Sequence, residues 1–269
     1  MTKPAARWVI DLDGVVWRGT DPIEGSVEAL CRLFEAGHSV LYFTNHAESP
    51  EIKIRRLRGM GVPEPLVITS AEAAAHLCGV NRRALVLGEP SLAQVIRDSG
   101  IDAIFIDDLP PDGPVPSVDA VIVGAATNWD RSRTGLAADA IRDGAMFIGT
   151  NSDPLFPFTG EFGPRFLPGA GALISAVETT AGARATFAGK PYQPAADLVT
   201  SRFGHVDYVV GDRDDTDGGF ARRLGAAFAL VMSGGTSREQ IPSDPAPEMV
   251  HDDLAAVVDH VLGLAGSRR

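Results

Sequence analysis

The sequence predicts an α/β protein built on a doubly wound parallel sheet, and three observations lead to this fold class. Short apolar runs alternate along the chain with segments whose apolar residues recur at helical spacing. Several of these runs stop on Asp, Thr or Asn, at the place where strands of a parallel sheet meet their ligands. The length of 269 residues is enough for one large domain or two modest ones.

The amino-terminal part of the chain alternates between strand and helix. The run that begins at Arg7 is short and apolar, as buried strands are. Gly37 is placed to end the helix that follows, and Ser49 with Pro50 marks another helix start. The expected elements are a strand from residue 7, a helix at 26–36, a strand at 39–45, a helix at 49–61, a strand at 66–69 and a helix from residue 70.

The middle of the chain repeats this pattern and then contains one long irregular segment. Residues 151–171 are rich in Pro, Gly and Phe, and a loop of that length inside a compact domain is usually functional. The expected elements are strands at 83–88, 103–106, 119–124 and 146–150, and helices at 134–143 and 172–180.

The last third returns to the first pattern. The expected elements are strands at 185–188, 208–212 and 227–232, with helices from residue 194, at 219–224 and at 252–262. We therefore expect a core formed by both ends of the chain, residues 1–75 and 184–269, and a second α/β domain inserted at 76–183.

Composition and charge limit the kinds of partner. The formal net charge of −11 argues against nucleic acid, although a local group of cations could still attract a small anion. No apolar run approaches the roughly 20 residues that span a bilayer, and residues 1–7 contain no signal-peptide core. Cys31 and Cys78 lie in apolar helical patterns, as buried free thiols do. These features predict a cytoplasmic protein without a membrane partner, in which the basic run 53–58 is the solvated face of a helix.

Asp11 and Asp13 stand at the end of the first strand. Residues two apart in a strand point the same way, and two carboxylates so close are costly unless a cation or a shared proton separates them. A calcium-binding EF-hand loop begins similarly, but its sixth position must be Gly and is Val16 here. The pair therefore indicates a metal, an acid–base pair, or both.

Other strand ends present further polar groups to the same edge of the sheet. These are Thr44 with Asn45, Lys190, and Asp212 with Asp217. Oxygen ligands without nearby His or Cys favour Mg²⁺, and a lysine beside a hydroxyl forms a cradle for an anion. The combination indicates a phosphoryl-transfer site, where catalysis is chiefly positioning and charge neutralisation.

Four ordered segments carry a resemblance to a known family: Asp11-Leu12-Asp13-Gly14-Val15, Phe43-Thr44-Asn45, Gly189-Lys190-Pro191 and Gly211-Asp212-Arg213-Asp214-Asp215-Thr216-Asp217. They resemble the four motifs of the haloacid dehalogenase (HAD) superfamily. The insertion between the second and third motifs resembles its class II, subclass A cap. Residues 149–153 and 167–172 resemble the branch that contains 4-nitrophenylphosphatase, phosphoglycolate phosphatase and glycerol 3-phosphate phosphatase.

The resemblance implies a Rossmann-like HAD core, an inserted α/β cap and a Mg²⁺-dependent phosphatase. Asp11 would be the nucleophile that forms an aspartyl-phosphate. Asp13 would protonate the leaving oxygen and then activate water, while its backbone carbonyl binds the metal. The remaining implied roles are phosphate binding by Thr44, Asn45 and Lys190, and metal binding by Asp11 and Asp212, with Asp217 either a ligand or an anchor for the metal's waters.

The sequence departs from this branch at two places. His46 stands where many relatives have a second Asn, beside the expected phosphate pocket, so substrate preference or pH response could differ. Residues 130–134 lack the tyrosine–lysine pair expected in the cap, which leaves the cap's substrate contacts open.

The sequence favours hydrolysis of a small phosphorylated metabolite, with several alternatives. A dehalogenase would use the same nucleophile but would not need Asp13, Asp212 or a metal. A phosphotransferase would need a specific acceptor, and a phosphate-binding or regulatory protein would not need the intact acidic residues. The substrate is left open among glycerol 3-phosphate, 2-phosphoglycolate, nucleoside monophosphates and sugar phosphates. A homodimer is an alternative to a monomer, because caps of this class often take part in dimer contacts.

Overall fold

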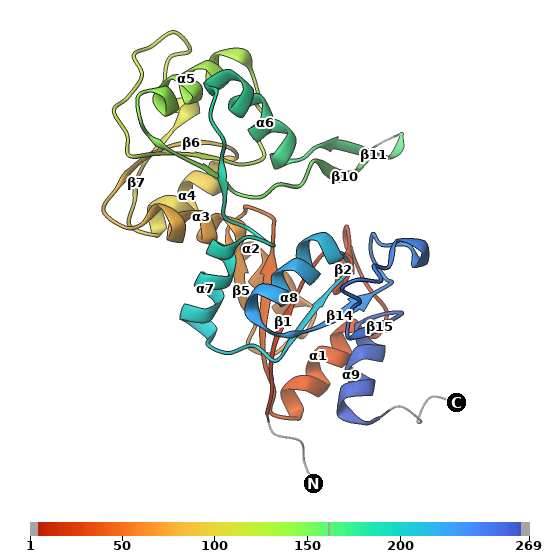
Figure 1. Ribbon diagram of the computed structural model, residues 1–269. Helices are drawn as coiled ribbons and strands as arrows, with labels where there is room; N and C mark the ends of the chain where they lie inside the picture. The colour runs from red at the N-terminus through yellow and green to blue at the C-terminus, as the bar shows by residue number, and fades with distance from the viewer. Residues whose placement is uncertain (1–4, 161, 265–269) are drawn as a thin grey trace. The chain divides into compact units, whose positions relative to one another are not determined.

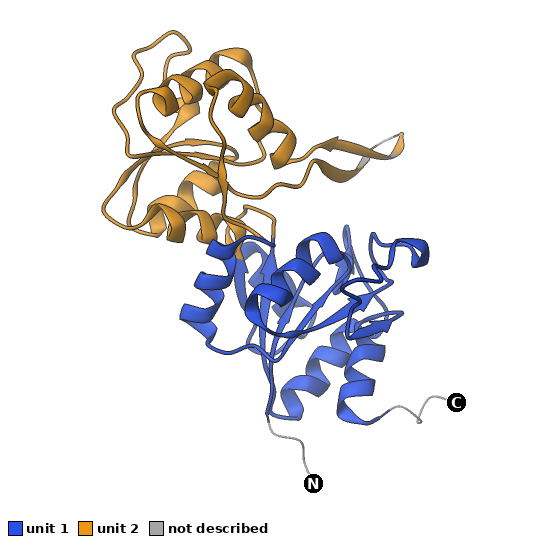
Figure 2. Cartoon of the chain, viewed as in Figure 1, with its two compact units in different colours: residues 1–44, 50–68, 190–269 blue, residues 45–49, 69–189 orange. Residues whose placement is uncertain are grey.

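The computed structural model describes residues 5–160 and 162–264, and the chain divides into two compact units (Figure 2). Unit 1 comprises residues 1–44, 50–68 and 190–269, and unit 2 comprises residues 45–49 and 69–189. For comparison, the sequence suggested an insertion at 76–183. Among the described residues, no helix is both long and apolar enough to cross a membrane.

Unit 1 is built on a six-stranded sheet in the order β15-β14-β13-β1-β4-β5 (Figure 1). The strands are β1 (Arg7–Ile10), β4 (Ser39–Thr44), β5 (Leu66–Thr69), β13 (Tyr208–Gly211), β14 (Ala227–Val231) and β15 (Met249–His251). β1 pairs in parallel with both β4 and β13, and the β13–β14 and β14–β15 pairs are parallel as well. The chain thus runs outward from β1 in both directions, which confirms the predicted doubly wound α/β fold class.

Helices cover the sheet of unit 1 because its strands are apolar on both faces. The helices are α1 (Ser26–Glu35), α2 (Pro50–Gly59), α7 (Gln193–Phe203), α8 (Gly219–Leu224) and α9 (Leu254–Leu262). α1 packs against α9, and Leu30 and Val258 from these helices share a core with Ile10 and Val210 of the sheet. On α8, Phe220 packs against Phe43, with 5.3 Å between ring centroids. Burial on both faces explains why these strands read as continuous apolar runs.

Unit 2 has its own sheet of five strands, in the order β12-β9-β8-β6-β7. The strands are β6 (Arg83–Leu87), β7 (Asp102–Phe105), β8 (Ala120–Val123), β9 (Met146–Gly149) and β12 (Thr186–Phe187), and all four pairings are parallel. The helices are α3 (Ser70–Cys78), α4 (Pro90–Asp98), α5 (Arg131–Arg142) and α6 (Ala170–Ala181). α5 packs against α6, and Ile174 and Val177 join Leu85 and Val121 in the core of this unit.

The expectation of a long irregular loop at 151–171 is wrong. The segment contains an antiparallel hairpin, β10 (Leu155–Gly160) paired with β11 (Gly163–Pro168), and α6 begins at Ala170 rather than Ala172 (Figure 1). The Pro and Gly content suggested a loop, but a two-stranded ribbon tolerates proline because each strand has one unpaired edge. A second small hairpin, β2 (Trp17–Arg18) with β3 (Asp21–Pro22), and the strand β15 were also not predicted.

Candidate active site

Asp11 lies at the carboxyl end of β1, where the chain leaves the sheet. Its backbone N–H still donates to the Val210 carbonyl of β13, at 2.9 Å. The chain then turns, and the N–H groups of Val16 and Trp17 both donate to the Leu12 carbonyl. Gly14 makes this turn with φ of +82°, and a Cβ there would lie 2.5 Å from Asp212 Oδ2. Glycine is therefore required both for the turn and for the close approach of Asp212.

Asp212 and Asp217 come from the end of β13 and the single π-helical turn η2 (Asp214–Gly218) that follows it. The Gly235 N–H donates to Asp212 Oδ2 at 2.6 Å. Asp217 packs against the strand end, because a Cβ on Gly211 would lie 2.2 Å from its Cγ. The residue types around these two carboxylates are thus fixed by close backbone approach.

Three carboxylates and one ammonium meet at this edge of the sheet of unit 1. One oxygen from each of Asp11, Asp212 and Asp217 lies within 4.8 Å of the others. Lys190 Nζ donates to Asp11 Oδ1 at 2.7 Å, to Asp217 Oδ1 at 2.6 Å and to the Phe43 carbonyl at 3.1 Å. Lys190, Asp212 and Asp217 are buried and Asp11 is nearly so. Four of the predicted site residues, from both ends of the chain, are therefore brought together.

Burial and the charges in this cluster shift the pKa values of Asp11, Asp212 and Lys190. Burial raises the pKa of Asp11 well above its usual value, and the charges of Asp217 and Asp212 add to this although Lys190 opposes it. Burial and the charge of Asp217 raise the pKa of Asp212 to about 6. Burial alone would lower the pKa of Lys190, but the charges of Asp11 and Asp217 outweigh it and raise that pKa. The site holds more negative charge than its single lysine neutralises.

This donor set fits a hard divalent cation. The three carboxylates offer only oxygen, the ligand type that Mg²⁺ takes, and they converge closely enough to share one ion. Crowded negative charge in a buried place helps to raise the pKa values of Asp11 and Asp212, and a bound cation would offset that charge.

The other predicted residues are placed as follows. Thr44 is the buried last residue of β4, the strand beside β1. Asn45 belongs to unit 2, where its side-chain amide donates to Asp153 Oδ2 at 3.0 Å and its carbonyl accepts from Ser70 Oγ at 2.6 Å. Asp13 is exposed in the turn after β1, outside the three-carboxylate group.

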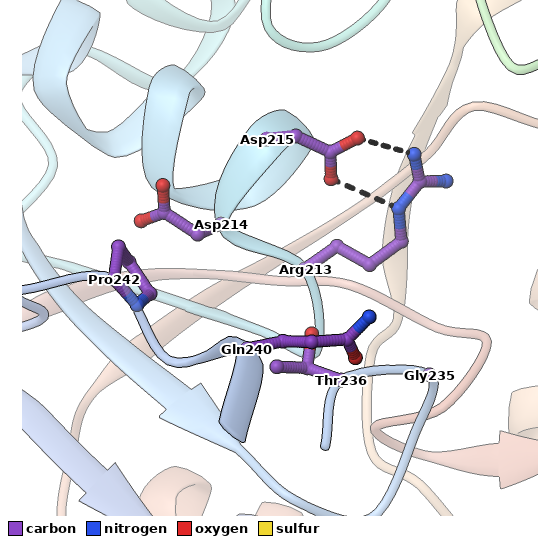
Figure 3. Close-up of a pocket in the computed structure, with 7 residues that line it drawn as sticks. All are labelled: Arg213, Asp214, Asp215, Gly235, Thr236, Gln240 and Pro242. Carbon is purple, nitrogen blue, oxygen red and sulfur yellow. Dashed lines mark hydrogen bonds and ion pairs between the residues drawn. The ribbon is translucent and has the colours of Figure 1, made fainter. Parts of the chain in front are cut away.

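A cavity of about 400 Å³ lies next to the Asp212 loop and is lined by polar side chains (Figure 3). The guanidinium of Arg213 faces the carboxylate of Asp215, with hydrogen bonds of 3.0 Å and 2.7 Å. The lining residues are Arg213, Asp214, Asp215, Gly235, Thr236, Gln240 and Pro242. The catalytic, phosphate-binding and metal-binding residues predicted from the sequence do not line this cavity, although Arg213, Asp214 and Asp215 belong to the fourth motif.

Two residues that contact the site region were not singled out from the sequence. The predicted solvated face at 53–58 is wrong in part, because Lys53 is buried and Arg56 stacks on the Trp17 ring with its guanidinium carbon 3.9 Å from the ring centroid. The Gly235 N–H that binds Asp212 was also not predicted. The role of Gly235 could have been predicted from the pair Gly234–Gly235, since two glycines mark a tight turn. No feature of the sequence predicts the contact of Arg56 with Trp17.

Comparison with known proteins gives the family. Residues 8–102 match a family model described as haloacid dehalogenase-like hydrolase, and residues 187–257 match one described as HAD-hydrolase-like. Chronophin of Bos taurus is 32% identical over 251 residues, which cover 86% of this chain and 82% of chronophin. The chain belongs to the haloacid dehalogenase-like hydrolases. The resemblance proposed from its four motifs is thereby confirmed.

Solved structures of two HAD relatives share the fold over nearly the whole chain. A p-nitrophenyl phosphatase from Archaeoglobus fulgidus has a TM-score of 0.81 and 27% identity, covering 96% of this chain and 100% of that one. A glycerol phosphate phosphatase from Mycobacterium tuberculosis was solved in complex with magnesium. It has a TM-score of 0.79 and 30% identity, covering 94% of this chain and 76% of that one. This chain therefore lies in a branch of HAD enzymes that includes named phosphatases.

Proposed function

We propose that this HAD enzyme is a Mg²⁺-dependent phosphatase that hydrolyses a small phosphate monoester through an aspartyl-phosphate on Asp11. The observation that carries the proposal is the meeting of Asp11, Asp212 and Asp217 within 4.8 Å of one another, with Lys190 bound to two of them. The magnesium in the structure of the M. tuberculosis relative and the phosphatase names of both solved relatives support it.

Asp11, Asp212 and Asp217 would hold the metal, together with the backbone carbonyl of Asp13. Bound Mg²⁺ supplies positive charge that keeps Asp11 ionised and offsets the charge of the phosphoryl oxygens. Asp217 also orients Lys190 through the 2.6 Å hydrogen bond, so its role can be as much to hold the lysine as to hold the metal.

The chemistry proceeds in two steps. An Asp11 carboxylate oxygen attacks phosphorus, and the ester oxygen leaves with the bonding electron pair and takes a proton from Asp13. Asp13, now a carboxylate, removes a proton from water, whose oxygen attacks the same phosphorus. The bond between phosphorus and Asp11 breaks, and inorganic phosphate and Asp11 are released.

The phosphate would be bound by Thr44, the backbone N–H of Asn45 and Lys190. An ammonium has three N–H donors, and Lys190 directs hydrogen bonds to three protein oxygens. A contact between Lys190 and phosphate therefore requires one of these to be exchanged for a phosphoryl oxygen. The bond to Asp11 is the natural one to yield, because Asp11 itself turns toward phosphorus in the reaction.

Unit 2 would serve as the class II cap that selects among small phosphorylated metabolites. The name of the M. tuberculosis relative makes glycerol 3-phosphate the first substrate to test. Cys31 and Cys78 are free thiols, which is consistent with a cytoplasmic enzyme. The alternative of a homodimer stays open.

The test is phosphate release from 4-nitrophenyl phosphate and from a panel of phosphorylated metabolites. We expect release that requires Mg²⁺ and stops with a chelator, and loss of at least about a hundredfold in Asp11→Asn, because a covalent nucleophile is removed. Release that the chelator does not reduce, or an Asp11→Asn variant close to wild type, would refute the proposal.

A further inference from the structure

The proposed general acid Asp13 lies in an exposed turn, where an aspartate would ordinarily be free to change rotamer. Its carboxylate is nevertheless held. Trp17 Nε1 donates to Asp13 Oδ1 at 2.9 Å. Among the described residues, the Asp13 side chain makes no other hydrogen bond. Oδ1 is therefore engaged, and Oδ2 remains available to substrate or water.

Trp17 can fix Asp13 because the indole itself is fixed. The ring is fully buried among the core residues of unit 1. Its backbone is tied to the turn by the Gly14 N–H, which donates to the Trp17 carbonyl at 2.7 Å, and by a bridge between Asp13 and Trp17. An indole N–H can only donate a hydrogen bond, so the atom of Asp13 that it contacts, Oδ1, must act as the acceptor.

Arg56 of α2 holds the tryptophan from the other side. Its guanidinium carbon lies 3.9 Å from the centroid of the indole, within cation–π range. Its Nη2 donates to the Gly19 carbonyl at 2.8 Å, in the connection between β2 and β3. One side chain thus clamps both the ring and the β2–β3 hairpin, called the flap here (residues 17–22).

We propose that Trp17 and Arg56 are positioning residues for the general acid: they hold Asp13 so that its transferable proton sits on Oδ2, the oxygen that faces the leaving group. This rests on the proposed function and adds to it. The N–H of Trp17 occupies Oδ1, so a proton carried by Asp13 must lie on Oδ2. In the first step that proton passes from Oδ2 to the ester oxygen as the P–O bond breaks, and in the second Oδ2 accepts a proton from water.

The decisive experiment compares two aryl phosphates of similar shape. 4-Nitrophenolate leaves readily without a proton, whereas phenolate leaves poorly and needs the general acid. In Trp17→Phe the buried ring and its contact with Arg56 remain and the N–H is lost. We expect kcat for phenyl phosphate to fall by up to about tenfold, the order expected when one hydrogen bond is lost, and kcat for 4-nitrophenyl phosphate to change less than about threefold.

Trp8→Phe is the matched control. Trp8, in β1, is also a fully buried tryptophan, but its Nε1 has no hydrogen-bond partner among the described residues. In Trp8→Phe we expect kcat for phenyl phosphate and kcat for 4-nitrophenyl phosphate to change by the same factor. Arg56→Met should also lower kcat for phenyl phosphate more than kcat for 4-nitrophenyl phosphate, but by less than Trp17→Phe does. Arg56→Lys keeps a cation over the ring, so its kcat for phenyl phosphate should lie between those of Arg56→Met and wild type. If Trp17→Phe fails to fold, as judged by its circular dichroism and melting temperature, the Arg56 pair decides.

Equal loss on both substrates in Trp17→Phe, or no loss on either, would overturn the inference, since a merely structural role does not distinguish leaving groups. Asp13→Asn separates this from a failure of the proposed function. If Asp13→Asn itself shows no preference between the two substrates, the general-acid assignment is wrong. If Asp13→Asn is selective and the Trp17 and Arg56 variants are not, only the positioning role is wrong.

Discussion

Lys190 brings a positive charge into a site that holds three carboxylates. Its ammonium is buried and bonded to Asp11 and Asp217, at 2.7 Å and 2.6 Å. Those charges raise the pKa of Lys190, and Lys190 in turn opposes the rise that burial causes in the pKa of Asp11. The sequence suggested a phosphate ligand at this position. In the structure Lys190 also offsets part of the negative charge of the carboxylates on which the site depends.

Replacing Lys190 by Met therefore leaves two buried carboxylates without their counter-charge. We expect the free energy of unfolding at pH 8 to fall by about 3–5 kcal/mol, the usual effect of removing one partner of a buried ion pair. The loss should be smaller near pH 5, because the pKa of Asp11 rises further in the variant and its protonated form needs no partner. Urea unfolding at the two pH values measures this. An equal loss at both would contradict the electrostatic account.

Asp212 makes the metal-free protein sensitive to pH. Its pKa is raised to about 6 in the folded chain, above the value of about 4 expected when unfolded. For a carboxyl with a raised pKa, the stabilising contribution is complete below about pH 4 and is lost as the pH rises through about 6. Above pH 6 the ionised group is destabilising unless a cation joins it.

We therefore expect Mg²⁺ to raise the melting temperature clearly at pH 7.5 and little at pH 5, because below pH 6 protons compete for the same oxygens. Melting curves with Mg²⁺ or with a chelator at each pH test this. In Asp212→Asn, Mg²⁺ should no longer raise the melting temperature at either pH. A response to Mg²⁺ that is the same at pH 5 and pH 7.5 would exclude Asp212 as a pH-sensitive ligand.

At the level of elements, the strand ends were predictable because apolar runs that stop on polar residues place those residues at one edge of a parallel sheet. β4 and β13 end one residue before the positions expected, and β1 ends directly before Asp11. The hairpin β10–β11 was not predictable in this way, because its Pro and Gly residues resemble those of a loop. The strand pairing of β2 with β3 was not predicted for a related reason: two-residue strands carry no periodic pattern.

The turn after β13 shows how an element positions a side chain. Asp217 lies against the strand end only because Gly211 has no side chain there, since a Cβ would come within 2.2 Å of Asp217 Cγ. Gly211→Ala should displace Asp217 and with it the bond to Lys190. We expect phosphatase activity to fall at least about tenfold, since small displacements of catalytic groups are costly.

Gly135→Ala on α5 is the matched control for Gly211→Ala, because a Cβ there meets open space. Alanine also favours a helix over glycine, so we expect unchanged activity and equal or higher melting temperature. If Gly211→Ala is as active as Gly135→Ala, the close packing of Asp217 against β13 does not matter for catalysis.

For the whole molecule, the site depends on residues far apart in the chain, with Asp11 near one end and Asp212 near the other. The fold class and family could be predicted because the four motifs keep their order and three of them follow strands of the sheet of unit 1. The expectation for Lys190 was wrong in this respect, because the strand before it, β12, belongs to the sheet of unit 2. Contacts made through buried packing could not, and Arg56 is the clearest case. It appeared as one of several basic residues in a helix, and only the folded chain sets its guanidinium over the ring of Trp17.

The central claim is that Asp11 carries the phosphoryl group, and rapid quenching in acid tests it most directly. Wild-type enzyme and Asp13→Asn are mixed with ³²P-labelled 4-nitrophenyl phosphate, whose leaving group needs no proton, and with Mg²⁺, and protein-bound label is assigned by peptide mapping. We predict an acid-stable, hydroxylamine-sensitive phosphoryl group on the peptide that contains Asp11, at a higher level in Asp13→Asn because water is activated more slowly. Phosphate release with no label on Asp11 in either protein would contradict the account.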